Sequence, residues 1–147
     1  MNRSIKRVAI LGSGIMGSRI ACHFANIGVQ VLLLDIAPKE LNPEEQAKGL
    51  SLEHPSVKNR IVNTAFQQTI QAKPASLYSS SFAKNIKLGN FDDNLAEIAQ
   101  VDWIMEVVVE NLAIKKSLYD RVEQFRKPGT LITSNTSGIP IHLIDRK

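Results

Sequence analysis

The sequence predicts an α/β fold in which a doubly wound parallel sheet lies between two layers of helices. Short aliphatic segments alternate with amphipathic helical segments along the 147 residues. This alternation is typical of parallel strands joined by right-handed helical crossovers. Segment 30–34 is almost entirely aliphatic, as expected of a strand buried on both faces of such a sheet. The length suits a single domain, at roughly 150 residues per domain.

The first half of the sheet is predicted from a strand at 7–11, a helix at 15–27 and a strand at 30–34. Residues 7–11 form a short β-rich run that ends at a glycine. The helix has apolar side chains at helical spacing, and Gly28 follows it as a typical closing residue. The second strand runs directly into Asp35.

A long excursion, residues 37–90, separates the two halves of the predicted sheet. Four prolines interrupt it, and residues 57–72 have the apolar spacing of one amphipathic helix. A strand near 85–88 is expected to rejoin the sheet. Asn90 is expected to cap a following helix that ends near Ala99, because asparagine side chains accept hydrogen bonds from helix N-termini.

The second half predicts a strand at 102–109, a helix at 113–125 and a last strand at 130–133. A further helix is expected to begin at Pro140. In a six-stranded sheet of this type another strand would cover 130–133. We therefore expect this segment to be an exposed apolar edge through which the chain self-associates.

Composition narrows the classes of protein that the chain can belong to. A single cysteine, Cys22, excludes an internal disulfide. No apolar window approaches the ~18 residues of a membrane span, and we expect a cytoplasmic location. The net charge is +4 and only 5% of residues are aromatic. Because the basic residues form no single tract, this charge favours small polyanionic ligands over nucleic acid.

The strongest motif is a G-x-G-x-x-G sequence between the first predicted strand and helix. Gly12 would allow the tight turn, Gly14 would let the backbone approach a pyrophosphate, and Gly17 would permit close helix–strand packing. The helix N-terminus would supply N–H groups and its dipole to the phosphates. In this setting the motif is the fingerprint of a Rossmann-type dinucleotide-binding domain.

Asp35 gives the second part of this fingerprint. It stands at the end of the second predicted strand, where a carboxylate accepts hydrogen bonds from the ribose hydroxyls of the adenosine. The same charge would repel a 2′-phosphate, so NAD is favoured over NADP. A glycine turn with an acid there by chance is the alternative.

Two polar segments follow later strands at the same edge of the predicted sheet. Glu110 ends an apolar run, and residues 134–138 offer hydroxyl and amide groups. Ligands of open parallel sheets bind beyond the carboxyl ends of the strands, so both segments are candidate binding sites. Ordinary helix caps and turns use the same residue types, and the residues alone leave this alternative open.

Three stretches of the sequence resemble one enzyme family. Residues 12–36, 102–122 and 127–141 are similar to the NAD-binding domain of the 3-hydroxyacyl-CoA dehydrogenases. The segments VENL-x-x-K and SNTS within them are much more specific than the glycine motif. The excursion most resembles bacterial two-function β-oxidation proteins, which join this dehydrogenase to an enoyl-CoA hydratase.

The resemblance implies that NAD is the cofactor and assigns parts of it to residues of this chain. Met16 would lie against the cofactor, with Asp35 on the adenosine ribose. Val109 and Glu110 would border the nicotinamide half. Lys115 would reach the ribose region of the cofactor, whereas its residue type alone equally suits a solvated lysine.

The loop after the last strand would complete the site. Ser137 would contact the nicotinamide end and orient the substrate, and Asn135 would shape the same loop. No metal site is expected. The expected cofactor-binding residues are therefore Gly12, Gly14, Ile15, Met16, Gly17, Asp35, Val109, Glu110, Lys115, Asn135 and Ser137.

The excursion carries a charge pattern that suits a second polyanion. From residue 54 to residue 90 there are five basic residues and no acidic ones. In the family this region is similar to a helical hairpin on the CoA-binding side, and CoA phosphates pair well with lysine and arginine. We expect 3-hydroxyacyl-CoA to contact this segment, with an ordinary solvated basic helix as the alternative. The five residues are Lys58, Arg60, Lys73, Lys84 and Lys87.

The resemblance also implies a reaction whose general base is missing from this sequence. In the family a hydride passes from C3 of a 3-hydroxyacyl thioester to NAD⁺, and a histidine, oriented by a glutamate, takes the hydroxyl proton. Both residues lie beyond the SNTS loop, as does a C-terminal helical domain. His23, His54 and His142 do not match that histidine. We expect residues 1–147 to be a truncated NAD-binding domain, inactive alone.

Two other functions remain compatible with the glycine motif. One is a β-hydroxyacid dehydrogenase that acts on a free acid, against which the VENL and SNTS segments argue. The other is a non-catalytic dinucleotide-binding module. NADH binding that depends on Asp35 would support a cofactor role, and turnover by the chain alone would contradict the expected inactivity.

Overall fold

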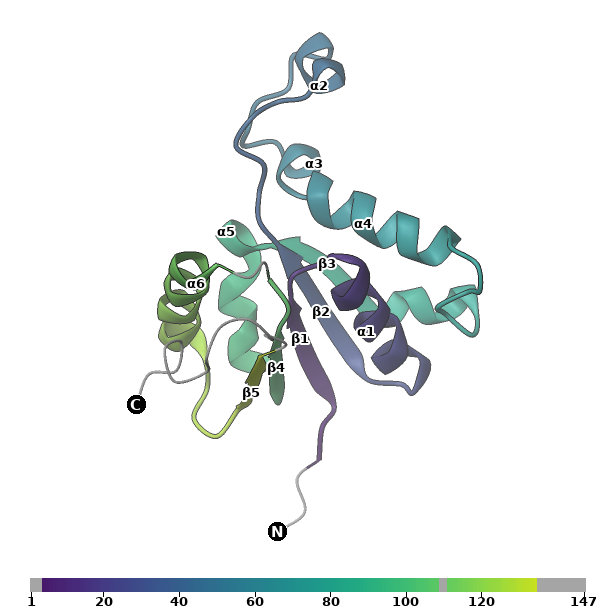
Figure 1. Cartoon of the computed structure of the whole chain (residues 1–147), viewed down its shortest axis with the longest axis vertical. Coiled ribbons are helices and arrows are strands. Elements are labelled where there is room, and N and C mark those ends of the chain that lie inside the picture. Colours follow the sequence, from purple (N-terminus) through teal and green to yellow (C-terminus); the bar gives the residue numbers. More distant parts are fainter. Residues whose placement is uncertain (1–3, 109–110, 135–147) are drawn as a thin grey trace.

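A five-stranded parallel sheet forms the centre of the molecule. The computed structural model describes residues 4–108 and 111–134, and within them the strand order is β3-β2-β1-β4-β5 (Figure 1). All four pairings are parallel. This confirms the predicted doubly wound α/β fold. The strands are β1 (Arg7–Leu11), β2 (Gln30–Asp35), β3 (Ile86–Asn90), β4 (Trp103–Glu106) and β5 (Leu131–Ser134).

Helices cover both faces of the sheet (Figure 1). On one face lie α1 (Ile15–Asn26) and α4 (Arg60–Gln71), and on the other lie the short α5 (Phe91–Asn94), the 3₁₀ helix η2 (Leu95–Gln100) and α6 (Leu112–Phe125). No described helix is both long and apolar enough to cross a bilayer.

Each central strand contributes side chains to two separate hydrophobic cores, because successive side chains point to opposite faces of the sheet. Val8 and Ile10 of β1 pack in the core beneath α1 and α4. Ala9 and Leu11 of the same strand pack in the core beneath η2 and α6. This explains why β1 and β2 are aliphatic at almost every position rather than alternating with polar residues.

The excursion differs from the single helix predicted over 57–72. It forms α2 (Pro43–Ala47), α3 (Pro55–Lys58), α4 and the 3₁₀ helix η1 (Ser80–Asn85). The helix is broken at Asn59, whose φ of −96° and ψ of 7° depart from α-helical values. The Asn59 side chain accepts a hydrogen bond from Asn90 Nδ2 at 2.8 Å, a contact 31 residues away in sequence that the helical periodicity does not reveal.

The arm that carries α2 stands away from the rest of the molecule (Figure 1). Arg60 at the start of α4 ties it down, because its guanidinium donates to the Glu40 carbonyl at 2.9 Å and lies 3.5 Å from a Glu45 carboxylate oxygen. A capping box between Asn42 and Glu45 starts α2. These contacts give the arm a defined shape.

Strand β4 is shorter than the predicted segment 102–109, since it ends at Glu106. Asp102, just before it, accepts hydrogen bonds from the Lys6 and Arg7 N–H groups at 3.0 and 3.1 Å. The hydrogen bond from Lys6 is the main cause that lowers the pKa of Asp102, and Lys127, 3.2 Å away, adds to it. Asp102 thus clamps the amino end of β4 to β1.

Most other predicted elements are confirmed within a few residues. Asn90 accepts a hydrogen bond from the Asp93 N–H at 2.9 Å and caps α5, as predicted. The structure ends that helix early and continues as η2. In the described part of the chain β5 lies at the sheet edge, with Leu131 41% exposed. Self-association through this edge stays a prediction.

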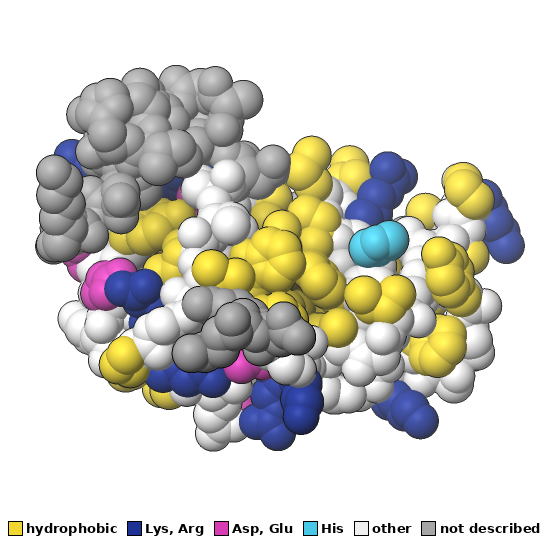
Figure 2. Space-filling view, turned by 90° about the horizontal axis from the view of Figure 1, so that it is seen from below, with side chains coloured by type: hydrophobic (Ala, Val, Ile, Leu, Met, Phe, Trp, Pro, Cys, Tyr) yellow, Lys and Arg dark blue, Asp and Glu magenta, His cyan; other side chains and the backbone are white. Residues whose placement is uncertain are grey.

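The face of the molecule seen in Figure 2 shows how charge is distributed. Apolar side chains gather in its centre, and Lys and Arg side chains lie around them as separate groups. On this face the described Lys and Arg side chains do not form one continuous basic patch.

Candidate cofactor-binding site

The glycine loop between β1 and α1 is held by backbone contacts that only glycine permits. Gly12 has a φ of +113°, and its N–H donates to the Leu34 carbonyl at 2.8 Å. A Cβ on Gly12 would lie 2.6 Å from the Val107 carbonyl oxygen. A Cβ on Gly17 would overlap the Gly12 carbonyl oxygen. The first and third glycines therefore allow the loop, α1 and the end of β4 to pack together.

Gly14 has a different role, since a Cβ there would meet no atom within 4 Å. It is the N-cap of α1, and no side chain of the described residues caps this helix. The open space therefore lies directly before a helix N-terminus, where backbone N–H groups and the helix dipole favour an anion. The local geometry fits a phosphate group.

Asp35 lies beside this loop at the end of β2. Its Oδ2 accepts hydrogen bonds from the Ser13 N–H at 2.8 Å and from the Ser13 hydroxyl at 2.5 Å. Its Oδ1 accepts one from the Ile36 N–H at 2.7 Å. The carboxylate is half-buried and is already oriented by the loop. Ser13 is fully buried and was missed from the sequence, because a serine at a variable position of the motif carries no signal of its own.

A cavity of about 580 Å³ opens next to Asp35 at the carboxyl ends of the strands. The glycine loop forms one wall, and α6 forms the wall opposite. Its lining is largely apolar, which suits a flat aromatic ring. The lining residues are Gly12, Ser13, Gly14, Asp35, Ile36, Phe91, Val107, Val108, Ala113, Ile114, Ser117, Leu118 and Arg121.

The residues that form this loop, carboxylate and cavity all lie within the part of the sequence that matches a family model. The model is described as "3-hydroxyacyl-CoA dehydrogenase, NAD binding domain", and it matches residues 7–147. The chain belongs to this family.

Relatives of the NAD-binding domain are similar across nearly its whole length. A probable 3-hydroxyacyl-CoA dehydrogenase of Bacillus subtilis is 45% identical over 141 residues, which are 96% of this chain and 18% of that protein. One from Deinococcus radiodurans is 35% identical over 139 residues, which are 95% of this chain and 36% of that protein. The chain thus spans well under half the length of these relatives.

Solved structures share the fold. The 3-hydroxybutyryl-CoA dehydrogenase of Escherichia coli superposes with a TM-score of 0.61 at 27% identity, covering 97% of this chain and 27% of that one. The arrangement of sheet and helices in the NAD-binding domain is therefore that of a known dehydrogenase.

The predicted site residues do not all line the same cavity. Gly12, Gly14 and Asp35 lie together around it. Ile15 and Met16 are 74% and 52% exposed on the first turn of α1, where they line a neighbouring groove. The residues Val109, Glu110, Asn135, Ser137 and His142 lie outside the described part of the chain.

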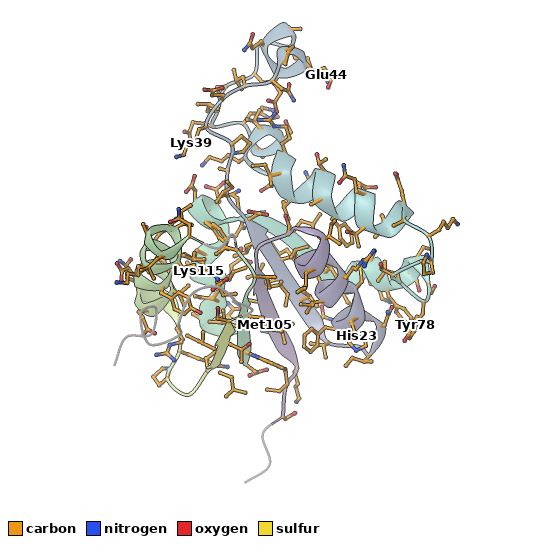
Figure 3. All side chains as sticks on the ribbon, in the orientation of Figure 1. His23, Lys39, Glu44, Tyr78, Met105 and Lys115 are labelled. Carbon is orange, nitrogen blue, oxygen red and sulfur yellow. The ribbon has the colours of Figure 1, made fainter. Side chains whose placement is uncertain are left out.

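Lys115 is placed differently from a solvated lysine. Its side chain is 0% exposed, and its Nζ lies 3.3 Å from Glu106 Oε1. Figure 3 shows Lys115 between α6 and the sheet, and it is absent from the described lining of the cavity. The solvated alternative is therefore wrong. Glu106, the partner, was missed because it lies inside the apolar run that predicted one long strand.

The two described histidines lie away from the cavity. His54 accepts a hydrogen bond from the Ser56 N–H at 3.2 Å and is the N-cap of α3. His23 is in the last turn of α1 (Figure 3). Neither is among the described residues that line the cavity.

Proposed function

We propose that this chain binds NAD and forms the cofactor-binding part of an enzyme that oxidises 3-hydroxyacyl-CoA to 3-oxoacyl-CoA in fatty-acid β-oxidation. The observation that carries the proposal is the open space before α1 at Gly14, with the oriented Asp35 carboxylate beside it. A pyrophosphate fits the first and a ribose the second. NAD supplies the hydride acceptor when bound.

The same geometry favours NAD over NADP. The Asp35 carboxylate would meet a 2′-phosphate with like charge. Arg121 also lines the cavity, but its guanidinium donates to the Phe91 carbonyl at 2.7 Å and lies 3.7 Å from an Asp92 carboxylate oxygen. Its charge is thus engaged, which leaves Asp35 as the dominant charge near the ribose.

The remaining site residues complete the proposal as the family resemblance assigns them. Val109 and Glu110 would border the nicotinamide half, and Asn135 would shape the loop in which Ser137 orients the substrate. Lys115 would reach the ribose region of the cofactor from its position between α6 and the sheet. These assignments rest on their positions in the VENL-x-x-K and SNTS segments.

The chain alone is proposed to bind cofactor without turning over substrate. Among the described lining residues, Asp35 and Arg121 are the ionisable ones. Asp35 accepts three hydrogen bonds, and arginine does not release its proton in proteins. Neither suits a general base, so hydroxyl deprotonation requires a group from elsewhere.

Cellular location and assembly are part of the same proposal. We place the protein in the cytoplasm, which the single buried Cys22 supports because it can form no internal disulfide. We also propose self-association through the β5 edge, which the exposed Leu131 supports.

Contact with the CoA phosphates is proposed for the basic residues of the excursion, but not for all of them equally. Lys58 lies 2.9 Å from Asp93 and 3.2 Å from Glu53, and these carboxylates raise the pKa of Lys58. Arg60 pairs with Glu45, and Lys87 pairs with Glu97. The charges of these three residues are partly neutralised by acids outside the segment.

Lys73 and Lys84 remain exposed, and Lys84 precedes β3, at the amino end of the sheet. Substrates of such sheets bind at the carboxyl ends of the strands, which counts against Lys84 and leaves Lys73 as the residue to test. Lys73→Glu is expected to raise the acetoacetyl-CoA Kd about threefold or more, while Lys84→Glu leaves it unchanged. Isothermal titration calorimetry on the NADH-loaded chain measures both. Equal affinities for all three proteins would contradict CoA contact at Lys73.

Asp35→Ala tests the cofactor assignment itself. Loss of the charged acceptor should raise the NADH Kd at least about tenfold, because hydrogen bonds to charged groups contribute about 1.5–3 kcal/mol. The NADPH Kd should change less or fall, since the repulsion of the 2′-phosphate is removed. Titration by NADH and NADPH fluorescence measures both constants.

Asp102→Asn is the matched control for this experiment. It removes a carboxylate that also accepts backbone N–H groups, but at the amino end of β4. We expect its NADH affinity to equal that of the parent chain. Parallel losses of NADH and NADPH binding in Asp35→Ala, or no loss at all, would count against the assignment of Asp35 to the adenosine ribose.

A further inference from the structure

We propose that Glu106 is a positioning residue that fixes the nicotinamide side of the cofactor site, an inference that rests on the proposed binding of NAD. Glu106 ends β4 and is 1% exposed. A carboxylate in such an environment requires several polar partners to remain charged. The partners of Glu106 come from separate segments of the chain.

Among the described residues, three groups converge on this carboxylate. Its Oε2 accepts a hydrogen bond from the Val108 N–H at 2.8 Å. Its Oε1 accepts one from the Ser134 hydroxyl at 2.7 Å and lies 3.3 Å from Lys115 Nζ. Glu106 therefore ties together the segment after β4, the end of β5 and the second turn of α6.

One of these partners, Val108, forms part of the cavity wall. Val107 and Val108 line the cavity, and the Val107 N–H donates to the Leu11 carbonyl at 2.8 Å. Ser134 lies opposite Glu106 in the register of β4 with β5. The chain that continues from Val108 and from Ser134 carries the VENL and SNTS residues. Glu106 thus binds the two residues, Val108 and Ser134, from which these segments continue.

The fold itself does not require a charge at this position. Replacing a buried ion pair by apolar residues of similar volume is often neutral or stabilising. The facing position of β1 is the apolar Leu11, so an aliphatic residue would extend the same core. A buried carboxylate that binds three polar groups fixes the positions of those groups. We therefore assign Glu106 to the geometry of the cofactor site rather than to the stability of the fold.

The position of Glu106 in the sheet indicates which half of the cofactor it serves. A dinucleotide lies across the point where the strand order reverses, beside β1. Asp35 stands on the β2 side of β1, and Glu106 stands on the other side, between β1 and β5. With the adenosine at Asp35, the nicotinamide half lies towards Glu106.

Glu106→Gln keeps the size of the side chain but removes its charge and replaces one acceptor oxygen by a donor. We expect the NADH Kd to rise at least about tenfold, and the Kd of AMP, which has only the adenosine half, to rise less than about threefold. Competition titrations on the 147-residue chain measure both constants. Amide hydrogen exchange should show faster exchange at Val108, whose N–H loses its charged acceptor.

Asp102→Asn provides the matched control, since it removes a carboxylate from the opposite end of the same strand. It should leave the affinities for NADH and AMP and the exchange at Val108 unchanged. A merely structural role for Glu106 would weaken NADH and AMP binding by the same factor, and this outcome would overturn the inference. Unchanged NADH affinity in Glu106→Gln would also overturn it, with the proposed function intact. If the parent chain binds neither ligand, the proposed function fails and this inference with it.

Discussion

Gly17→Ala is expected to abolish NADH binding and to destabilise the fold strongly. A Cβ at this position overlaps the Gly12 carbonyl oxygen, and backbone atoms of a packed turn have little room to move. Overpacking of a core commonly costs about 1–3 kcal/mol, and a clash with backbone places this variant at or above the upper end. Thermal unfolding followed by circular dichroism measures the loss, and NADH fluorescence measures binding.

Gly14→Ala separates folding from binding at the same loop. Its Cβ meets nothing within 4 Å, so the Tm should stay within about 2 °C of the parent. Its methyl group enters the space that the pyrophosphate needs, so NADH affinity should still fall at least about tenfold. A Gly17→Ala chain as stable as Gly14→Ala would refute the packing role of Gly17. A Gly14→Ala chain that binds NADH normally would place the pyrophosphate elsewhere.

Lys115→Met should cause the second large loss of stability. It leaves Glu106 as a buried carboxylate without its cationic partner, and breaking a buried pair in this way typically costs about 3–5 kcal/mol. For a chain of this size we expect the Tm to fall by about 10 °C or more. Methionine fills most of the volume of the lysine stem, so the loss reports the charge rather than a cavity. Urea unfolding at constant salt concentration measures this loss in the free energy of unfolding.

Lys116→Met is the control that the chain itself provides. Lys116 is the next residue of α6 and is exposed, so its removal should change the free energy of unfolding by less than about 0.5 kcal/mol. Similar effects of the two substitutions would mean that the pair of Lys115 with Glu106 contributes little to the folded state.

The sequence was sufficient for the glycine loop because all of its information is local. The order of strand, loop, helix and second strand follows from hydrophobic periodicity, and the positions of Gly12 and Asp35 follow from that order. The alternation of strands and helices also predicted the parallel sheet. The sheet brings these residues to one edge, as the structure confirms.

The features that sequence reasoning missed depend on partners far along the chain. Glu106 was placed inside one strand because its neighbours are apolar, whereas its partner Ser134 lies 28 residues away. Asn59 was placed inside one helix, whereas its side chain bonds to Asn90, 31 residues away. Single-sequence periodicity contains no information on such pairs. The burial of Lys115 likewise depends on how α6 packs on the sheet.

The hydrogen bonds between Ser13 and Asp35 have a consequence for how the cofactor is received. The Ser13 N–H and hydroxyl donate to the carboxylate in the same way that ribose hydroxyls would. A ribose hydroxyl would therefore add a donor to a carboxylate that the loop already orients, because an ionised carboxylate has about four acceptor sites. Asp35 and the glycine loop already have the conformation that binds the cofactor. Little conformational entropy of the loop is therefore lost on association. Selectivity between nucleotides then depends on whether the 2′ position offers a donor to the remaining acceptor site of Asp35, and a 2′-phosphate offers none.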